Sequence, residues 1–280
     1  MKTKARSRVP KATLRKYERL QAILRDMGRV LVAFSGGADS SLVLKAARDV
    51  LGRNALAVTA STEVHTAREL REAKAAAAAI GAPLQVVRAR IIGRPAFAAN
   101  PPDRCFHCKS ALFSLFRDIA RAKGAAHVLD GSNADDAADW RPGERALRTL
   151  GVRSPLREAG LVKKEVRALS RWLGLPTADR PSLACLASRF PYGTPIDRPG
   201  LRRVGAAEDL LRSMGFRQVR VRHHGSIARV EVEPDLIPKL LRKDARARLV
   251  RALKGLGWSY VALDLDGYRT GSLNEVLGKR

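Results

Sequence analysis

The stretch RVLVAFSGGADSS, residues 29–41, decides the fold of this chain. Its first six residues form a short, almost wholly apolar run, as a buried parallel strand requires. From Ser40 to Leu51 the apolar residues have helical spacing, and Gly52 stands where a helix would end. The two glycines between these elements let backbone N–H groups and a helix N-terminus converge on an anion. The stretch therefore predicts a strand, a phosphate-binding loop and a helix.

The rest of the chain repeats this alternation and predicts an α/β fold. Parallel strands with helices on both faces bind their ligands beyond the carboxyl ends of the strands. The Pro- and Gly-rich stretch 191–200 reads as a linker, so we expect a first domain over 1–194 and a smaller α/β domain over 195–280. Further strands are expected at 55–60, 84–88, 127–130, 218–223, 227–232 and 259–265, and further helices at 66–80, 109–123, 204–214 and 238–256.

The charge of the chain favours anionic partners. Its 280 residues carry 53 Lys and Arg against 27 Asp and Glu, a formal net charge of +26. Such a surface attracts nucleic acid, anionic membranes or small phosphorylated and carboxylated substrates, although arginine is also an ordinary surface residue. No apolar run approaches the ~18 residues of a membrane helix. The first twenty residues lack the apolar core of a secretory signal, so we expect a cytoplasmic protein without a membrane partner.

Two loops carry the candidate ATP-binding residues. The loop SGGADSS resembles the PP-loop of the ATP pyrophosphatase superfamily, whose pattern is SGGxDS after the first strand, and it lacks the GKS or GKT of a Walker A motif. Asp39 supplies a carboxylate where Mg²⁺ and phosphate would lie. The second loop, DGSNADD at 130–136, follows the fourth expected strand, where carboxylates could bind the magnesium of ATP or simply form a solvated turn. The predicted ATP contacts are Ser35, Gly36, Gly37, Asp39, Ser40, Ser41, Asp130, Gly131 and Asn133.

The three cysteines suggest metal or thiol chemistry. Cys105 and Cys108 form a C-x-x-C pair and Cys185 lies far downstream, which does not fit a disulfide framework in an intracellular chain. Structural zinc normally takes four ligands, and His107 is wedged between two of the cysteines. Three thiolates suit an iron–sulfur cluster with one iron that has no protein ligand. A redox C-x-x-C and simple buried cysteines are the alternatives.

Blocks along nearly the whole chain resemble the LarE family of ATP-dependent sulfur transferases. The resemblance implies that ATP is cleaved between its α and β phosphates, that a substrate carboxylate is adenylated, and that a sulfide then replaces oxygen. The family's substrate is a pyridinium mononucleotide whose two carboxylates become thiocarboxylates, for the nickel-pincer nucleotide cofactor of lactate racemase. The matching blocks are NPPDRCFHCK at 100–109, DGSNADD at 130–136, GVRSPL at 151–156, CLASRFPYG at 185–193, VRVRHHGSIAR at 219–229 and LDLDGYRTGS at 263–272.

The cysteines are similar to those of one of the two variants of this family. One variant sacrifices the cysteine at the position of Cys185, which becomes dehydroalanine, and it lacks the C-x-x-C pair. The other holds a [4Fe-4S] cluster on three cysteines and carries a replaceable sulfide on the open iron. The resemblance therefore implies Cys105, Cys108 and Cys185 as cluster ligands and Cys185 and Asp39 as catalytic residues. Whether Cys185 is a ligand only or is sacrificed stays open, as does the sulfur donor.

Resemblance also assigns the substrate contacts, namely Ser188, Arg189, Arg220, Arg222 and Arg269. Strand alternation places Arg220 and Arg222 on one face, and arginine forks suit phosphate and carboxylate groups. The family forms homo-oligomers, in which Arg269 would reach a neighbouring subunit. The alternative function is a PP-loop enzyme that thiolates tRNA. The chain has only 7 Phe, 4 Tyr and 3 Trp and no appended RNA-binding module, so a nucleic-acid partner is not expected.

Overall fold

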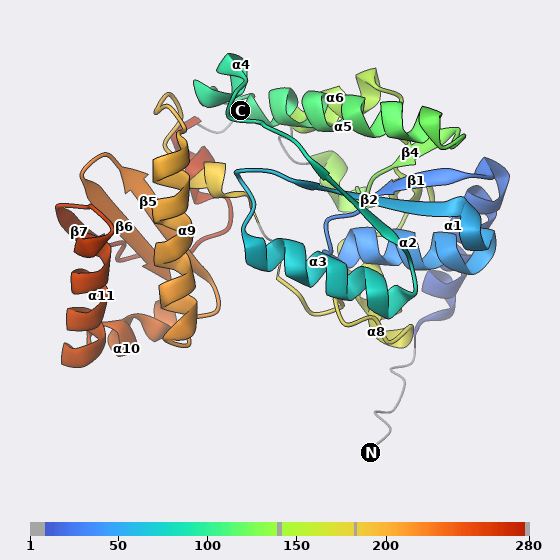
Figure 1. Cartoon of the computed structure of the whole chain (residues 1–280). Coiled ribbons are helices and arrows are strands. Elements are labelled where there is room, and N and C mark those ends of the chain that lie inside the picture. Colours follow the sequence, from blue (N-terminus) through green and yellow to red (C-terminus); the bar gives the residue numbers. More distant parts are fainter. Residues whose placement is uncertain (1–8, 139–141, 182–183, 278–280) are drawn as a thin grey trace. The chain divides into compact units, whose positions relative to one another are not determined.

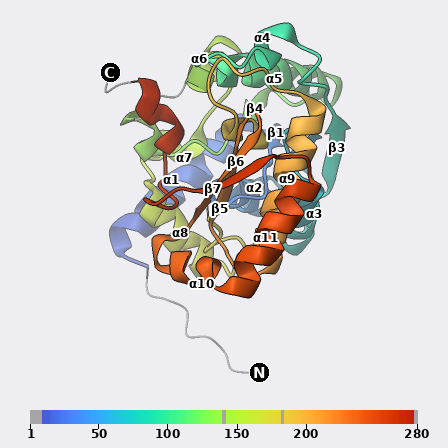
Figure 2. The same cartoon turned by 90° about the vertical axis from the view of Figure 1, so that its left-hand side faces the viewer.

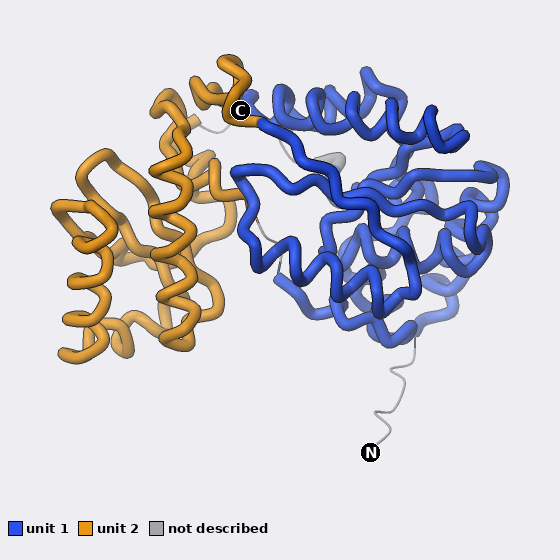
Figure 3. Tube along the Cα trace, viewed as in Figure 1, with its two compact units in different colours: residues 1–90, 103–183 blue, residues 91–102, 184–280 orange. Residues whose placement is uncertain are grey.

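The computed structural model describes residues 9–138, 142–181 and 184–277, which form two compact units. Unit 1 comprises residues 1–90 and 103–183, and unit 2 comprises residues 91–102 and 184–280 (Figure 3). The chain therefore enters unit 2 briefly before it completes unit 1. The boundary that the sequence predicts, between residues 194 and 195, falls within unit 2.

Unit 1 is built on a four-stranded parallel sheet of order β3-β2-β1-β4. The strands are β1 (Val30–Ala33), β2 (Ala55–Ser61), β3 (Leu84–Arg88) and β4 (His127–Leu129). The helices are α1 (Lys11–Met27), α2 (Ala38–Leu51), α3 (Ala67–Ile80), α5 (Arg104–Ala122), α6 (Pro142–Thr149), α7 (Pro155–Glu158) and α8 (Lys163–Trp172), with 3-10 turns η1 (Gly52–Asn54) and η2 (Ala134–Ala138).

Helices cover both faces of this sheet, because its strands are apolar on both sides (Figure 1). Val30 and Val32 of β1 pack in a cluster with residues of α1, α2, α3 and α8, whereas Leu31 packs in a second cluster with α5 and α6. Successive residues of a strand point to opposite faces, so one short strand contributes to both layers. This arrangement confirms the predicted α/β fold and places the carboxyl ends of β1 and β4 at the same edge.

Helix α5 begins five residues earlier than the sequence predicts, at Arg104 rather than at residue 109. The buried positions Phe113 and Phe116 mark its apolar stripe, whereas the buried residue of its first turn is Arg104, so the stripe does not extend to the start of the helix. The sequence pattern therefore misses that turn. As a result Cys105 and Cys108 lie on the helix itself, one turn apart.

Unit 2 contains a three-stranded sheet of order β5-β6-β7, in which β5 pairs antiparallel with β6 and β6 pairs parallel with β7. Helices α9 and α11 lie along this sheet (Figure 2). The helix expected over 238–256 is broken at Arg242, whose ψ of 139° is extended. The elements are α4 (Pro95–Ala98), η3 (Leu186–Arg189), α9 (Arg198–Ser213), β5 (Val219–His224), β6 (Ile227–Val232), η4 (Pro234–Leu236), α10 (Ile237–Leu241), α11 (Lys243–Gly255), β7 (Tyr260–Leu263) and η5 (Ser272–Leu277).

The described residues contain no helix that is long and apolar enough to cross a membrane.

Candidate functional site

The predicted phosphate loop lies between the end of β1 and the start of α2, as its sequence indicates. Gly36 has a φ of 74°, in the left-handed region that favours glycine. A Cβ at Gly36 would lie 2.8 Å from the Cα of Ala73 on α3, so glycine also allows α3 to pack against the loop. The first N–H groups of α2 have no partner within the helix. Together with the helix dipole they form an anion-binding site.

The serines of the loop act mainly as internal braces. The hydroxyl groups of Ser35 and Ser40 are 3.0 Å apart, and the Gly37 N–H donates to the Ser35 hydroxyl at 3.3 Å. Ser41 is fully buried, and its hydroxyl has no hydrogen-bond partner among the described residues. The loop therefore offers an incoming phosphate mainly its backbone, with the serines holding that backbone in shape.

The second predicted loop lies directly against the first. A Cβ at Gly131 would lie 2.9 Å from the Ser40 nitrogen, so only glycine allows this approach without a shift. The Asn133 side-chain amide donates to the Asp39 carboxylate at 3.3 Å. Asp130 is buried and accepts hydrogen bonds from the Ser154 hydroxyl at 2.6 Å and from both the N–H and the hydroxyl of Ser132. Its carboxylate therefore shapes the loop.

Sequence reasoning missed Lys163, which stands at the first position of α8. Its ammonium group forms an ion pair with Asp39, and its backbone N–H donates to the Asp135 carboxylate at 2.8 Å. A lysine at a helix N-terminus opposes the helix dipole, which is the one signal that the sequence itself offered. The phosphate loop thus has a cation and a carboxylate at its edge, although its own sequence carries no lysine.

The three cysteines form no disulfide, and the structure places them in different units. Cys105 and Cys108 lie three residues apart in the first turn of α5, on one face of the helix. Cys185 precedes η3 in unit 2, and its carbonyl accepts hydrogen bonds from the N–H and the hydroxyl of Ser188. In the described part of the chain no group of three or more His, Cys, Asp or Glu side chains is arranged to hold a metal ion.

Two of the predicted substrate arginines are buried and already paired. Arg189, only 2% exposed, donates two hydrogen bonds to Glu208 of α9, at 2.7 and 2.9 Å. Arg222 donates in the same way to Glu231 on the neighbouring strand, and a third hydrogen bond reaches the Ser188 carbonyl at 2.7 Å. Unit 2 therefore brings Ser188, Arg189 and Arg222 together, with glutamates that fix the two guanidinium groups.

Arg220 differs from its two neighbours. Its guanidinium donates to the Val219 carbonyl at 2.7 Å and lies 4.9 Å from the centre of the Tyr268 ring. No carboxylate of the described residues lies within ion-pair distance of it. Burial, and next the charge of Arg189, lowers the pKa of Arg220, while Glu208 acts in the opposite direction. Glu208 and Glu231 also pair with Arg212 and Arg229, so arginines outnumber glutamates here, and among the three predicted arginines it is Arg220 that forms no ion pair with a described carboxylate.

Arg269 is bound by its own unit. Its guanidinium forms ion pairs with Asp266 at 2.7 Å and with Glu275 of η5 at 3.1 Å. The hydrogen bonding that Arg269 donates to the Glu275 carboxylate is the largest contribution to a raised pKa of Arg269. An anion that uses Arg269 must therefore displace these carboxylates.

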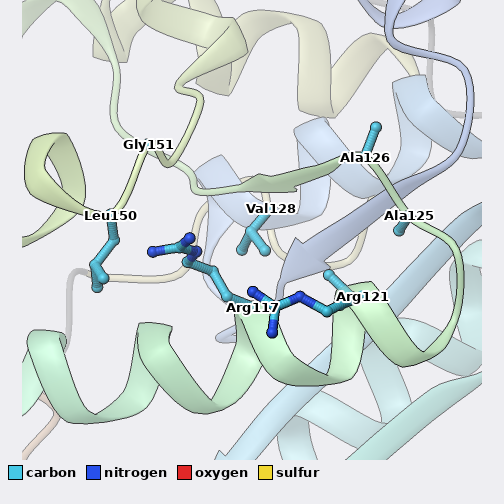
Figure 4. A pocket seen from close by; sticks show the side chains of 8 residues that line it. Arg117, Arg121, Ala125, Ala126, Val128, Leu150 and Gly151 are labelled. Carbon is cyan, nitrogen blue, oxygen red and sulfur yellow. The ribbon is translucent and has the colours of Figure 1, made fainter.

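A cavity of about 400 Å³ lies away from the phosphate loop (Figure 4). It is lined by Arg117 and Arg121 of α5 and by Ala125 and Ala126, which precede β4. Since β1 and β4 are parallel, the cavity lies at the amino end of β4 and the phosphate loop lies at the opposite edge. The cavity is not part of the predicted ATP site.

Two known proteins are similar to this chain over nearly its whole length, and a third over part of it. The chain is 44% identical over 264 residues to an uncharacterized protein of Synechocystis sp., with 94% of this chain and 98% of that protein covered. It is 43% identical over 261 residues to the pyridinium-3,5-bisthiocarboxylic acid mononucleotide synthase of Lactiplantibacillus plantarum, with 93% and 94% covered. A tRNA(Ile)-lysidine synthase of Salinispora tropica is 36% identical over 181 residues, which are 62% of this chain and 50% of that enzyme. No protein-family model matches the chain.

Proposed function

Because this chain belongs to the LarE family of ATP-dependent sulfur transferases, we propose that it converts the two carboxylates of pyridinium-3,5-biscarboxylic acid mononucleotide to thiocarboxylates. The observation that carries this proposal is the similarity to the Lactiplantibacillus plantarum synthase over nearly the full length of both chains, together with the paired loops at the ends of β1 and β4. The product serves as a precursor of a nickel-pincer nucleotide cofactor.

The phosphate loop and Lys163 account for the use of ATP. A carboxylate oxygen of the substrate attacks the α-phosphorus, the bond between the α and β phosphates breaks, and pyrophosphate leaves with the electron pair. The N-terminus of α2 binds the phosphates. Asp39 would hold the Mg²⁺ that enters with ATP, and Lys163, which is paired with Asp39 in the structure, would then bind a phosphate oxygen. The acyl adenylate then carries AMP as a good leaving group.

The arginine cluster of unit 2 accounts for an acceptor with several negative charges. A mononucleotide dicarboxylate carries a phosphate and two carboxylates, which repel one another unless cations lie beside them. We assign the anion contact chiefly to Arg220, which forms no ion pair with a described carboxylate. The Ser188 hydroxyl can add a neutral donor only after its hydrogen bond to the Cys185 carbonyl is released. Arg189 and Arg222 keep the cluster in shape through Glu208 and Glu231. Arg269 takes part only after release from its own carboxylates.

The sulfur source is proposed to be a [4Fe-4S] cluster on Cys105, Cys108 and Cys185. The first two fit as a pair, because thiols one helical turn apart project from the same face of α5. Such a cluster, when bound, supplies a sulfide that is renewed without consuming the polypeptide. The chain's own contribution is to present the activated carbonyl, from which AMP departs as sulfur adds.

The decisive assay is anaerobic. The full chain is incubated with the dicarboxylate mononucleotide, ATP, Mg²⁺ and sulfide, and the masses of all nucleotides are followed. We expect AMP, pyrophosphate and one oxygen-to-sulfur exchange per carboxylate over several turnovers. ADP and orthophosphate, or exchange on tRNA but not on the mononucleotide, would refute the proposal. A single turnover that leaves dehydroalanine at position 185 would replace the cluster by the sacrificial route.

Two arginine variants test the assignment of the acceptor site. Arg220→Met should weaken binding of the mononucleotide about 10- to 100-fold, the value of a hydrogen bond to a charged group, and leave the stability of the fold nearly unchanged. Arg222→Met should weaken binding and also destabilise the fold, because the fully buried Glu231 loses its two short hydrogen bonds from Arg222 and keeps only the longer contact with Arg229, at 3.3 Å. Equal effects of the two variants on both measurements would contradict the assignment.

We also propose that the protein is a cytoplasmic homo-oligomer, in which Arg269 serves a neighbouring subunit. Light scattering of the purified chain gives its mass in solution, and Arg269→Ala should lower sulfur transfer without changing pyrophosphate release at saturating substrate. A monomer that turns over at full rate would contradict this.

A further inference from the structure

Arg180 has no role in the function derived so far, yet it contacts the phosphate loop. It lies in unit 1, in the segment that follows α8. One terminal nitrogen of its guanidinium donates to the Gly36 carbonyl at 3.1 Å, and the Glu72 carboxylate of α3 is 4.0 Å away. The side chain is 28% exposed, so a cation stands at the solvent side of the loop that receives phosphate.

The backbone that carries Arg180 is held in place from α8. The Arg167 guanidinium donates to the Ala178 carbonyl at 2.9 Å and to the Arg180 carbonyl at 3.0 Å. Arg171, on the same helix, forms an ion pair with Asp179 at 2.7 Å. Two arginines therefore anchor residues 178–180. The side chain of Arg180 extends toward the loop from a fixed position, which limits the entropy that it loses on binding a ligand.

Most of the hydrogen-bonding capacity of Arg180 is unused. A guanidinium has five N–H donors, and the bond to Gly36 uses one of them. Glu72 is at the limit of an ion pair and is shared with Arg68. In the described ranges no other acceptor is bonded to this guanidinium. A planar fork of free donors beside an anion-binding helix N-terminus matches the geometry of phosphate oxygens.

We propose that Arg180 binds the β- and γ-phosphates of ATP and holds the pyrophosphate as it leaves. The Gly36 carbonyl belongs to the loop that would bind the phosphates, so a guanidinium bonded to that carbonyl lies at the edge of the same anion-binding loop. When the bond between the α and β phosphates breaks, its electron pair passes to the leaving pyrophosphate, and Arg180 donates to the oxygens that gain this charge. The inference rests on the proposed function only in requiring that ATP binds at the phosphate loop.

The competing role for Arg180 is structural, since a bond to the Gly36 carbonyl could simply brace the loop. The two roles differ in which ligands they affect. Loss of a phosphate contact lowers the affinity for ATP and for pyrophosphate but not the affinity for AMP, which lacks the β- and γ-phosphates. Loss of a hydrogen bond that only holds the loop in shape lowers the affinity for all three ligands and also the thermal stability of the chain.

The test compares Arg180→Met, Arg180→Lys and the control Arg171→Met in the full chain, by calorimetric titration with ATP, pyrophosphate and AMP. Arg180→Met should weaken ATP and pyrophosphate binding about 10- to 100-fold and leave AMP binding within about twofold. Arg180→Lys should recover part of the loss, because it restores the charge without the fork. Arg171→Met removes one of the two anchors of the same segment. Because Arg167 keeps both of its hydrogen bonds to residues 178 and 180, this variant should weaken ATP and pyrophosphate binding by no more than about twofold and leave AMP binding unchanged.

Two results would overturn the inference. One is unchanged ATP binding in Arg180→Met, and the other is a parallel loss of ATP, pyrophosphate and AMP binding with a lower melting temperature. A wild-type chain that binds no ATP would instead refute the proposed function. The two failures can thus be told apart.

Discussion

Removal of the Glu208 carboxylate tests whether the arginine cluster depends on its buried glutamates. Glu208 is 0% exposed and accepts two hydrogen bonds from Arg189 at 2.7 and 2.9 Å, one from Arg212 at 2.7 Å, and one from the Val221 N–H at 3.2 Å. Glu208→Ala leaves the Arg189 guanidinium buried without a counter-charge. Breaking a buried ion pair by removing one partner costs about 3–5 kcal/mol.

The neighbouring residue provides a matched control. Asp209 is 52% exposed and forms an ion pair with Arg212 at 3.0 Å, on the same helix as Glu208. Exposed ion pairs contribute about 0–1 kcal/mol, so Asp209→Ala should change stability little. The comparison separates burial from charge, because both substitutions remove one carboxylate from adjacent positions of α9.

Hydrogen exchange followed by mass spectrometry can measure the loss of stability around Glu208 within unit 2 alone. Amides of α9 and β5 report the free energy of local opening, even where the two units unfold separately. A cost of about 3–5 kcal/mol makes their exchange faster by roughly 100-fold to several thousand-fold in Glu208→Ala. Exchange in the sheet of unit 1 should not change. Equal protection in Glu208→Ala and Asp209→Ala would refute the reasoning.

Three further predictions concern the loops and pH. Gly131→Ala places a Cβ 2.9 Å from the Ser40 nitrogen, so it should lower the free energy of unfolding by about 1–3 kcal/mol and slow pyrophosphate release. Gly255→Ala is the control, because its Cβ meets no atom within 4 Å, and it should change neither the unfolding free energy nor the rate of turnover. Lys163→Met should raise the KM for ATP in a pyrophosphate-release assay and leave mononucleotide binding unchanged in a titration. Burial raises the pKa of Glu208, but Arg189 and further arginines outweigh this and hold the pKa below its ordinary 4.5. Stability from Glu208 is therefore present above pH 4.5 and is lost below it, which hydrogen exchange of α9 at falling pH would record.

The sequence predicted the elements that depend on local pattern. The apolar runs at β1 and β2 are buried strands, and the glycine-rich loop between β1 and α2 lies where its strand–loop–helix context places it. Gly131 and Asn133 were predicted to share the ATP site, and they lie against Asp39 and Ser40. Parallel strands bring their carboxyl ends together, so residues far apart in the chain could be assigned to one site from the sequence alone.

Features that depend on tertiary partners could not be predicted in this way. Lys163 and Arg180 reach the phosphate loop from α8 and from the segment after it, more than a hundred residues downstream. The unfavourable place of Lys163 at a helix N-terminus does not say which loop it contacts, and no local pattern marks Arg180. The first turn of α5 was missed because the residue that it buries is Arg104 and not an apolar side chain. The break at Arg242 went unseen because helical spacing continues on both sides of it.

The arginine cluster shows most clearly where local reasoning ends. Alternation along β5 placed Arg220 and Arg222 on one face and made them look equivalent. The pairing of β5 with β6 and the packing of α9 distinguish them, since Arg222 reaches Glu231 and Arg189 reaches Glu208, whereas no described carboxylate pairs with Arg220. A buried guanidinium without a carboxylate is costly to the fold. Under the proposed function this cost is offset when the mononucleotide binds, which makes Arg220 the position of the cluster where a substitution should weaken acceptor binding without breaking an ion pair of the fold.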